Sequence, residues 1–173
     1  SLLIDEGWSL VLEREGQQYW LFDEDREWED ARAMCEELGA YLYWPNDDSE
    51  HQAIWDLLPH GDDGVQFWTA IHQDSSIVSC NSEDDGGWVG PTGLLQSYLP
   101  WYSSTNGSEP SNGSNGESVV QFEWSIIGSA FNDAPGQSGC DGYSNCPCRF
   151  ARVILERSIV CSDAMACNYN ESE

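Results

Sequence analysis

Hydrophobic positions near the start of the chain form two short runs. Residues 8–12 (Trp-Ser-Leu-Val-Leu) and 19–22 (Tyr-Trp-Leu-Phe) are mostly apolar, and Gly16 lies in the polar stretch between them. Two such runs joined by a Gly-containing connection predict a β-hairpin.

The period then changes from that of a strand to that of a helix. Four apolar or small residues recur at helical spacing: Trp28, Ala31, Cys35 and Leu38. The intervening positions are charged: Glu29, Asp30, Arg32, Glu36 and Glu37. This pattern predicts an amphipathic helix, and Gly39 is placed to end it.

A second helix is expected to begin at Ser49, because Gln52 stands three residues later in the capping-box position. Its inner face would consist of three apolar residues: Ile54, Leu57 and Leu58. Pro59 would end the helix. Residues 66–71 then predict a buried strand.

From residue 72 to residue 116 regular periodicity nearly disappears, and Gly, Ser, Asn and Asp dominate. A loop this long inside a compact domain is either disordered or functional. Four aromatic residues favour an anchored, functional loop: Trp88, Tyr98, Trp101 and Tyr102. Strands return at residues 119–124 and 150–155. The order of elements indicates an α+β fold.

The charge balance is extreme, with 31 Asp and Glu against 6 basic residues, a formal net charge of −25. Such a surface repels phosphates and anionic lipids, so we expect no nucleic-acid binding and no direct membrane insertion. An aromatic content of 12% argues against disorder. Adaptation to salty water and neutralisation by divalent cations both fit the charge, and we favour both.

Seven Cys predict an oxidising, extracellular or cell-surface location. Zinc is a weaker interpretation, because no CxxC pair exists and His51, His60 and His72 lie far from the later Cys residues. We divide the chain into a domain at 1–159 and a tail at 160–173. The tail, with Cys161 and Cys167, looks like the opening of a Cys-containing extracellular repeat.

Several oxygen-bearing side chains flank the second half of the long loop. Glu109 and Glu117 lie on either side of a turn rich in Gly and Asn, and Asn132 and Asp133 follow the next strand. Brought together, such groups would repel unless a cation lay between them, and calcium accepts 6–8 such oxygens. A cis Glu109–Pro110 bond would fix the carbonyls of a tight loop. Taken alone, solvated loop acids explain the same residues better.

The order of these landmarks resembles the C-type lectin-like domain family over about residues 17–157. The landmarks are Tyr19-Trp20, Trp28–Ala31 with Cys35, Gly39–Leu42, Glu50, Phe67–Ile71, Gly87–Val89, Gly93, Trp101, Glu109-Pro110, Glu117, Asn132-Asp133 and Val153–Glu156. The resemblance implies a C-type lectin-like fold with two helices, small antiparallel sheets and a long calcium-binding loop.

The resemblance also implies a function: a calcium-dependent carbohydrate-binding module in which sugar hydroxyls complete the coordination of a loop-bound calcium ion. The implied metal ligands are Glu109, Glu117, Asn132 and Asp133. Ser111 stands where the family motif has Asn, and Asn112 could take its place; both join the expected ligand-binding set. The Glu-Pro pair leans toward mannose-type sugars. A second calcium ion would use Glu83, Asp84 and Asp85, although an acidic turn without metal fits them equally well.

The family's disulfide pattern is only partly present. The resemblance would place a partner for Cys35 near Leu155 and another Cys near 118–119, where this chain has none. Cys35 is then a buried thiol, or it reaches Cys161. Cys80 would connect the long loop to the cysteines at 140–148. Connectivity cannot be derived from the sequence.

Two other classes of function remain open. The first is an adhesion or protein-binding module in which calcium only stiffens the loop, with ice binding as a minor variant; Ser111 and the exposed-looking Trp88, Trp101 and Tyr102 motivate it. The second is an enzyme, which we do not expect, because the only acid–base pair would be Glu109 with Glu117. The three His are interpreted as surface or helix-end residues.

Overall fold

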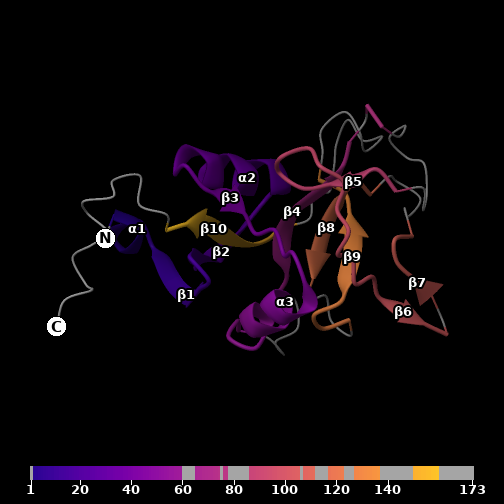
Figure 1. Cartoon of the computed structure of the whole chain (residues 1–173), viewed down its shortest axis with the longest axis horizontal. Helices are drawn as coiled ribbons and strands as arrows, with labels where there is room; N and C mark the ends of the chain where they lie inside the picture. Colours follow the sequence, from indigo (N-terminus) through magenta and orange to yellow (C-terminus); the bar gives the residue numbers. More distant parts are fainter. Residues whose placement is uncertain are drawn as a thin grey trace.

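The computed structural model describes residues 2–59, 65–74, 76–77, 86–105, 107–111, 117–122, 127–136 and 150–159. The helices are α1 (Leu2–Asp5), α2 (Trp28–Glu37) and α3 (Asp48–Trp55). The strands are β1 (Trp8–Arg14), β2 (Gln17–Arg26), β3 (Tyr41–Leu42), β4 (Phe67–Gln73), β5 (Trp88–Val89), β6 (Ser103–Ser104), β7 (Gly107–Ser108), β8 (Val119–Phe122), β9 (Phe131–Ala134) and β10 (Ala151–Ser158). Figure 1 shows α2 and α3 on opposite sides of the sheet. In the described part of the chain, no helix is long and apolar enough to cross a membrane.

The predicted hairpin is confirmed, and its strands are longer than expected. β1 and β2 pair antiparallel, with Arg14 opposite Gln17. Glu15 and Gly16 form the two-residue connection, and both have positive φ, 51° and 81°. Positive φ at both central residues is the geometry whose twist matches that of the flanking strands.

Eight strands form one mixed sheet, in the order β1-β2-β10-β4-β8-β9. β3 adds to β10, and β5 adds to β4. The predicted α+β class is confirmed. The other strand pairings in this sheet are antiparallel, but β10 pairs with β4 in parallel, at Arg152 and Phe67, and so connects the β1–β2–β10 part of the sheet to β4, β8 and β9. β6 and β7 form a separate two-stranded sheet.

The helix predicted at Trp28 is confirmed, and Trp28, Ala31 and Cys35 are its buried residues. The prediction for the second helix is wrong in two details. The N-cap is Asp47, whose Oδ1 accepts the Glu50 N–H at 2.8 Å, and not Ser49. The helix ends at Trp55 and not at Pro59, so Leu57 and Leu58 lie beyond it; Leu58 is still buried, but Leu57 is 56% exposed. The short helix α1 has no counterpart in the sequence predictions.

Two hydrophobic clusters cover the two faces of the sheet. One contains Trp28, Ala31 and Cys35 of α2 with Trp68 of β4. The other contains Ile54 of α3 with Phe67 and Ile71 of β4, together with Phe122 and Phe131. Successive residues of β4 and β8 alternate between the clusters, as the pleat of a strand requires. Phe131, directly before Asn132-Asp133, therefore faces α3.

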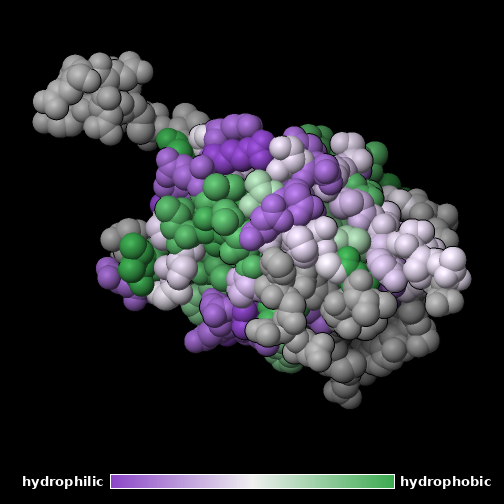
Figure 2. All heavy atoms as spheres, turned by 90° about the horizontal axis from the view of Figure 1, so that it is seen from below, coloured by the Kyte–Doolittle hydropathy of each residue, from purple (hydrophilic) through white to green (hydrophobic). Residues whose placement is uncertain are grey.

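Part of the apolar surface stays exposed. On the face in Figure 2, hydrophilic side chains border a patch of hydrophobic ones, on the side where Figure 1 places β1 and β2. Leu10 of the edge strand β1 is among the exposed large hydrophobic residues.

Candidate functional site

Backbone hydrogen bonds join the long loop to β9. The Phe131 N–H donates to the Pro100 carbonyl at 2.8 Å, and the Tyr102 N–H donates to the Phe131 carbonyl at 3.0 Å. The Glu109 N–H donates in turn to the Tyr102 carbonyl at 2.8 Å. Phe131 is thus the point at which the loop that carries Glu109 is attached to the strand that carries Asn132 and Asp133.

The aromatic residues of the long loop add side-chain packing to this attachment. Trp101 contacts both Trp88 and Phe131, with ring centroids 5.0 and 6.1 Å apart, and Tyr98 also packs against Phe131 at 6.1 Å. The anchored loop that these residues predict is confirmed. Their expected exposure is wrong for Trp88, which is 3% exposed, while Trp101 and Tyr102 are half-buried. Trp88 is buried because it belongs to the hydrophobic cluster on the α3 side of the sheet, against which Tyr98 and Trp101 also pack.

β8 and β9 set the positions of the predicted amide and carboxylate. Their antiparallel register places Asn132 opposite Gln121 and Asp133 opposite Val120. Both residues are almost fully buried. The Asn132 Nδ2 donates to the Asp133 carbonyl at 2.6 Å, which fixes the orientation of the side-chain amide.

The side chain of Glu109, on the long loop, is hydrogen-bonded to the side chain of Asp133, on β9. The Glu109–Pro110 peptide bond is cis. The Ser111 N–H donates to Asp133 Oδ1 at 3.0 Å. The pKa of Glu109 is raised to about 7, first by burial and then by a hydrogen bond to the Asp133 side chain. Ser111 opposes the shift, while the charges of Asp133 and Glu117 add to it.

The structure therefore brings only some of the six expected ligand-binding residues together. Glu109, Ser111 and Asp133 are in contact, Asn132 is the strand neighbour of Asp133, and Glu117 acts on Glu109 through its charge. Asn112 lies outside the described residues, as do the second-site candidates Glu83, Asp84 and Asp85. Across the ranges that the structure describes, no three His, Cys, Asp or Glu side chains converge closely enough to hold a metal.

The chemistry of the pair nevertheless suits a hard cation. Two carboxyl groups lie within hydrogen-bond reach, so at least one must hold a proton unless a cation takes its place. Glu109 Oε2 is buried without a hydrogen-bond partner. Carboxylate and amide oxygens are the ligands that calcium prefers.

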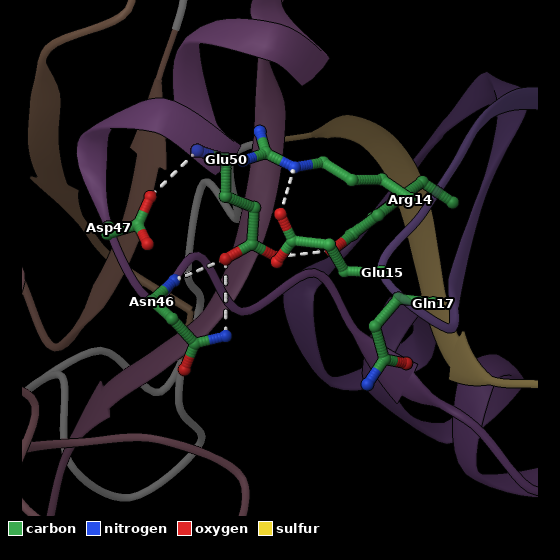
Figure 3. A pocket seen from close by; sticks show the side chains of 7 residues that line it. Arg14, Glu15, Gln17, Asn46, Asp47 and Glu50 are labelled. Atoms are coloured by element: carbon green, nitrogen blue, oxygen red, sulfur yellow. Dashed lines mark hydrogen bonds and ion pairs between the residues drawn. The ribbon is translucent and has the colours of Figure 1, made fainter. Parts of the chain in front are cut away.

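A second polar pocket, of about 220 Å³, lies between the β1–β2 turn and the start of α3. Figure 3 shows the side chains of Arg14, Asn46, Asp47 and Glu50 close to one another, whereas Gln17 points away from them. Glu50 accepts hydrogen bonds from the Tyr19 hydroxyl and from the Asn46 backbone and side chain, while Arg14 donates to Ser49. The lining groups form hydrogen bonds with one another, and these bonds connect the β1–β2 hairpin to the start of α3.

Glu156 of β10 is a buried acid near this pocket. It accepts the Trp44 backbone N–H at 2.9 Å. Burial raises its pKa to about 8; the Trp44 hydrogen bond opposes this shift, and the charge of Glu50 adds to it.

His51 is the residue that the sequence interpretation placed wrongly. It is 2% exposed and lies inside α3, neither on the surface nor at a helix end. Its position three residues before Ile54 and seven before Leu58, both buried, is a helical-face signal that could have revealed it. His72 is half-buried in β4, and His60 lies outside the described residues.

Cys35 is a free, buried thiol, as predicted. Burial raises its pKa, which keeps the thiol protonated. The other six cysteines, with the proposed Cys80 pairing and the Cys161 alternative, lie outside the described residues.

This fold and these landmarks define a family. The model of the C-type lectin domain matches residues 24–150, and the chain belongs to this family. The resemblance noted in the sequence is confirmed. A comparison with curated protein sequences gives no match.

Solved structures of the same fold cover nearly the whole chain. The carbohydrate-recognition domain of mouse scavenger receptor C-type lectin is 19% identical, with a TM-score of 0.62 over 91% of this chain and 98% of that one. The carbohydrate-recognition domain of cow CD23, solved in the presence of a GlcNAc2Man3 oligosaccharide, is 17% identical, with a TM-score of 0.61 over 90% and 96%. A calcium-independent type II antifreeze protein is 15% identical, with a TM-score of 0.60 over 88% and 92%.

Proposed function

We propose that this domain is a calcium-dependent carbohydrate-binding module of an extracellular or cell-surface protein. The observation that carries the proposal is the hydrogen-bonded pair of the half-buried Glu109 and the buried Asp133, where Asp133 also accepts the Ser111 N–H. Asp133 and Glu109 Oε2 are buried, so ionising both neighbouring carboxyl groups is expensive without a counterion.

Glu109, Glu117, Asn132 and Asp133 would hold the ion. When bound, calcium supplies open coordination positions for the vicinal hydroxyls of a sugar. Each of these side chains has a second polar atom that can bond to a hydroxyl group. Ser111 and Asn112 would add hydroxyl and amide contacts at the rim. Because no three acidic groups converge among the described residues, we expect ion binding to draw Glu117 toward the Glu109–Asp133 pair.

The ligand would be a glycan or glycoconjugate. Support comes from the cow CD23 domain, which was solved with a mannose-containing oligosaccharide, and from the Glu-Pro pair, which leans toward mannose-type sugars. We propose no catalytic role, since this family is in general not enzymatic. A soluble chromogenic glycoside should stay uncleaved. The second calcium site at Glu83, Asp84 and Asp85 and the separate tail at 160–173 remain predictions.

The test combines a calcium titration with glycan retention. Calcium should raise the melting temperature, because the ion binds the folded state in preference to the unfolded chain. Glu117→Ala and Asn132→Ala should each abolish retention on a mannose-type resin, and EDTA should do the same to the unaltered protein. Glu37→Ala, which removes an exposed acid from α2, should change neither result. Retention that survives both substitutions and EDTA would overturn the proposal.

A second candidate is an adhesion or protein-binding module in which calcium only stiffens the loop. Ser111 in place of the family's Asn favours it, and the similar antifreeze structure shows that this fold also serves without calcium. The expected exposure of Trp88 also motivated this candidate, but Trp88 is buried and does not support it. A calcium-induced rise in melting temperature without any hit on a glycan array would favour this candidate over sugar binding.

A further inference from the structure

His51 of α3 makes two hydrogen bonds inside the core. Its Nε2 lies 2.7 Å from the Ser129 carbonyl oxygen, and its Nδ1 lies 3.0 Å from the Tyr43 hydroxyl. A carbonyl oxygen can only accept, so Nε2 must carry the ring proton. In the neutral ring Nδ1 then accepts from the Tyr43 hydroxyl. Both nitrogens of the neutral ring are thus satisfied, whereas protonation of Nδ1 would require the Tyr43 hydroxyl to turn and accept instead.

Aromatic rings enclose this imidazole. Tyr43 stacks on it at 5.9 Å between centroids, and three further rings meet it edge to face: Phe122 at 4.8 Å, Phe131 at 5.2 Å and Tyr98 at 6.1 Å. Such a surrounding favours a neutral ring, because a buried charge loses its hydration.

The contacts of His51 lead directly to the candidate site. Ser129, whose carbonyl accepts from His51, lies three residues before Asn132 on the turn that enters β9. Phe131, which packs on the His51 ring, is hydrogen-bonded to Pro100 and Tyr102, and Tyr102 accepts from the Glu109 N–H. One side chain therefore supports both halves of the site, the strand with Asn132-Asp133 and the loop with Glu109.

We propose that His51 is a positioning residue for the calcium and sugar site: as a neutral imidazole it holds Ser129 and Phe131 in place, and its protonation loosens the site. This inference rests on the proposed function, because it assigns a pH-dependent control to that same site. His51 touches neither ion nor sugar in this assignment; it acts through β9.

Acid should remove this support. A second proton on Nδ1 would face the Tyr43 hydroxyl hydrogen, so that hydroxyl must turn away inside a fully buried pocket. Burial lowers the pKa of His51, although the Ser129 carbonyl and the Asp48 carboxylate oppose the shift. Tyr43 and Tyr98 also face the ring; burial raises the pKa of each, so both stay uncharged donors.

The direction of the pH effect follows from this lowered pKa. The unfolded chain binds a proton on His51 more readily than the folded domain does, so the support is present above about pH 6.5 and is lost as pH falls below that value. Glu156, with its raised pKa, contributes in the opposite sense, because its ionisation destabilises the fold as pH rises. Glu109, an expected ligand whose pKa is raised to about 7, also takes up a proton over this range and would weaken ion binding by itself. The profile of the unaltered protein alone therefore cannot isolate His51, and the comparison is made between variants that all keep Glu109.

The experiment measures calcium affinity of the whole chain from about pH 5 to about pH 8, the range over which His titrates. In the unaltered protein, affinity should fall steeply on the acid side. His51→Gln keeps a neutral donor and acceptor at every pH, so the acid-side loss should shrink to the part that protonation of Glu109 causes. Tyr43→Phe removes the hydroxyl that favours the neutral ring, so its affinity should fall at a higher pH than in the unaltered protein. His72→Gln is the matched control, because His72 bonds to Ala70 and packs on Trp28 on the other face of the sheet.

The outcomes separate the two claims. No calcium binding by the unaltered protein at any pH would defeat the proposed function itself. Calcium binding in which both His51→Gln and Tyr43→Phe keep the unaltered pH profile would defeat only the role of His51. If His51→Gln lacks the near-ultraviolet circular dichroism of the folded domain, the shift in Tyr43→Phe decides alone.

Discussion

Gln121 is a fully buried residue of β8 with neither end of its amide hydrogen-bonded. Its strand neighbours in the register are Trp68 of β4 and Asn132 of β9. A buried polar group without a partner keeps the full cost of its desolvation. The amide of Gln121 therefore lowers the stability of the folded domain, and an apolar residue of similar size should raise it.

We expect Gln121→Met, which is close in volume and has no amide, to raise the free energy of unfolding by roughly 1–2 kcal/mol. Urea denaturation followed by Trp fluorescence measures this difference. Gln121→Glu, of the same shape but ionisable, should destabilise the domain instead. A Met variant that is less stable than the unaltered protein would show that the amide does have a stabilising partner.

Single residues also mark the limit of what the sequence could reveal about the site. Glu109, Asn132 and Asp133 could be named because a run of landmarks in the right order identified the family. Ser111 entered only as a departure from the motif, yet its backbone N–H contacts Asp133, an interaction that any non-proline residue could make. The pairing of Glu109 with Asp133 depends on how the loop attaches to Phe131, and no local pattern encodes that attachment.

At the scale of elements, the turn at Gly90–Gln96 shows how closely the long loop packs. Its hydrogen bonds run from the Gly93 N–H to the Gly90 carbonyl and from the Gly90 N–H to the Leu94 carbonyl. Gln96 accepts from the Trp44 indole N–H at 2.6 Å and donates to the Pro45 carbonyl at 2.8 Å. A Cβ added at Gly90 would lie 2.4 Å from the Trp44 ring. The backbone thus rests directly on the indole.

We expect Gly90→Ala to destabilise the domain by about 1–3 kcal/mol, because the added methyl group forces the turn off Trp44. Thermal and urea unfolding measure the loss. Gly93→Ala is the control: an added Cβ meets nothing within 4 Å, and only its φ of +78° is unfavourable, at about 1 kcal/mol. Trp44→Leu should reduce the penalty of Gly90→Ala in a double variant. Equal losses at both glycines would contradict the close contact.

The two main helices show why some elements could be predicted and others only in part. α2 has a wide charged face and a regular apolar stripe, so its extent followed from periodicity. α3 is short and buries Glu50 and His51 together with Ile54, so its polar core-facing residues looked like surface. Its cap was placed two residues late because Ser49 and Asp47 offer the same signal, and only the Asp47–Glu50 hydrogen bond distinguishes them.

At the scale of the whole molecule, acidic charge is almost unopposed. All five arginines in the described residues already have partners. Arg14, Arg26, Arg32 and Arg152 form ion pairs with acids, and Arg157 bonds to Gln18 and lies over the Trp20 ring. With a formal net charge of −25, the folded domain repels itself at low ionic strength. Cations can relieve this repulsion in two ways, by a diffuse atmosphere or by a defined site.

We expect both effects, and salt separates them. Raising NaCl to about 1 M shortens the screening length to roughly 3 Å, so the melting temperature should rise and then level off as the diffuse repulsion disappears. Millimolar calcium added on that plateau adds no further screening. Any additional rise must come from a site that binds the folded state, and it should grow with the logarithm of calcium concentration. Glu117→Ala should lose this second rise and keep the first. If calcium has no effect on the plateau, its stabilisation at low salt is general charge neutralisation, and the acidic surface, not the Glu109–Asp133 pair, is what calcium binds.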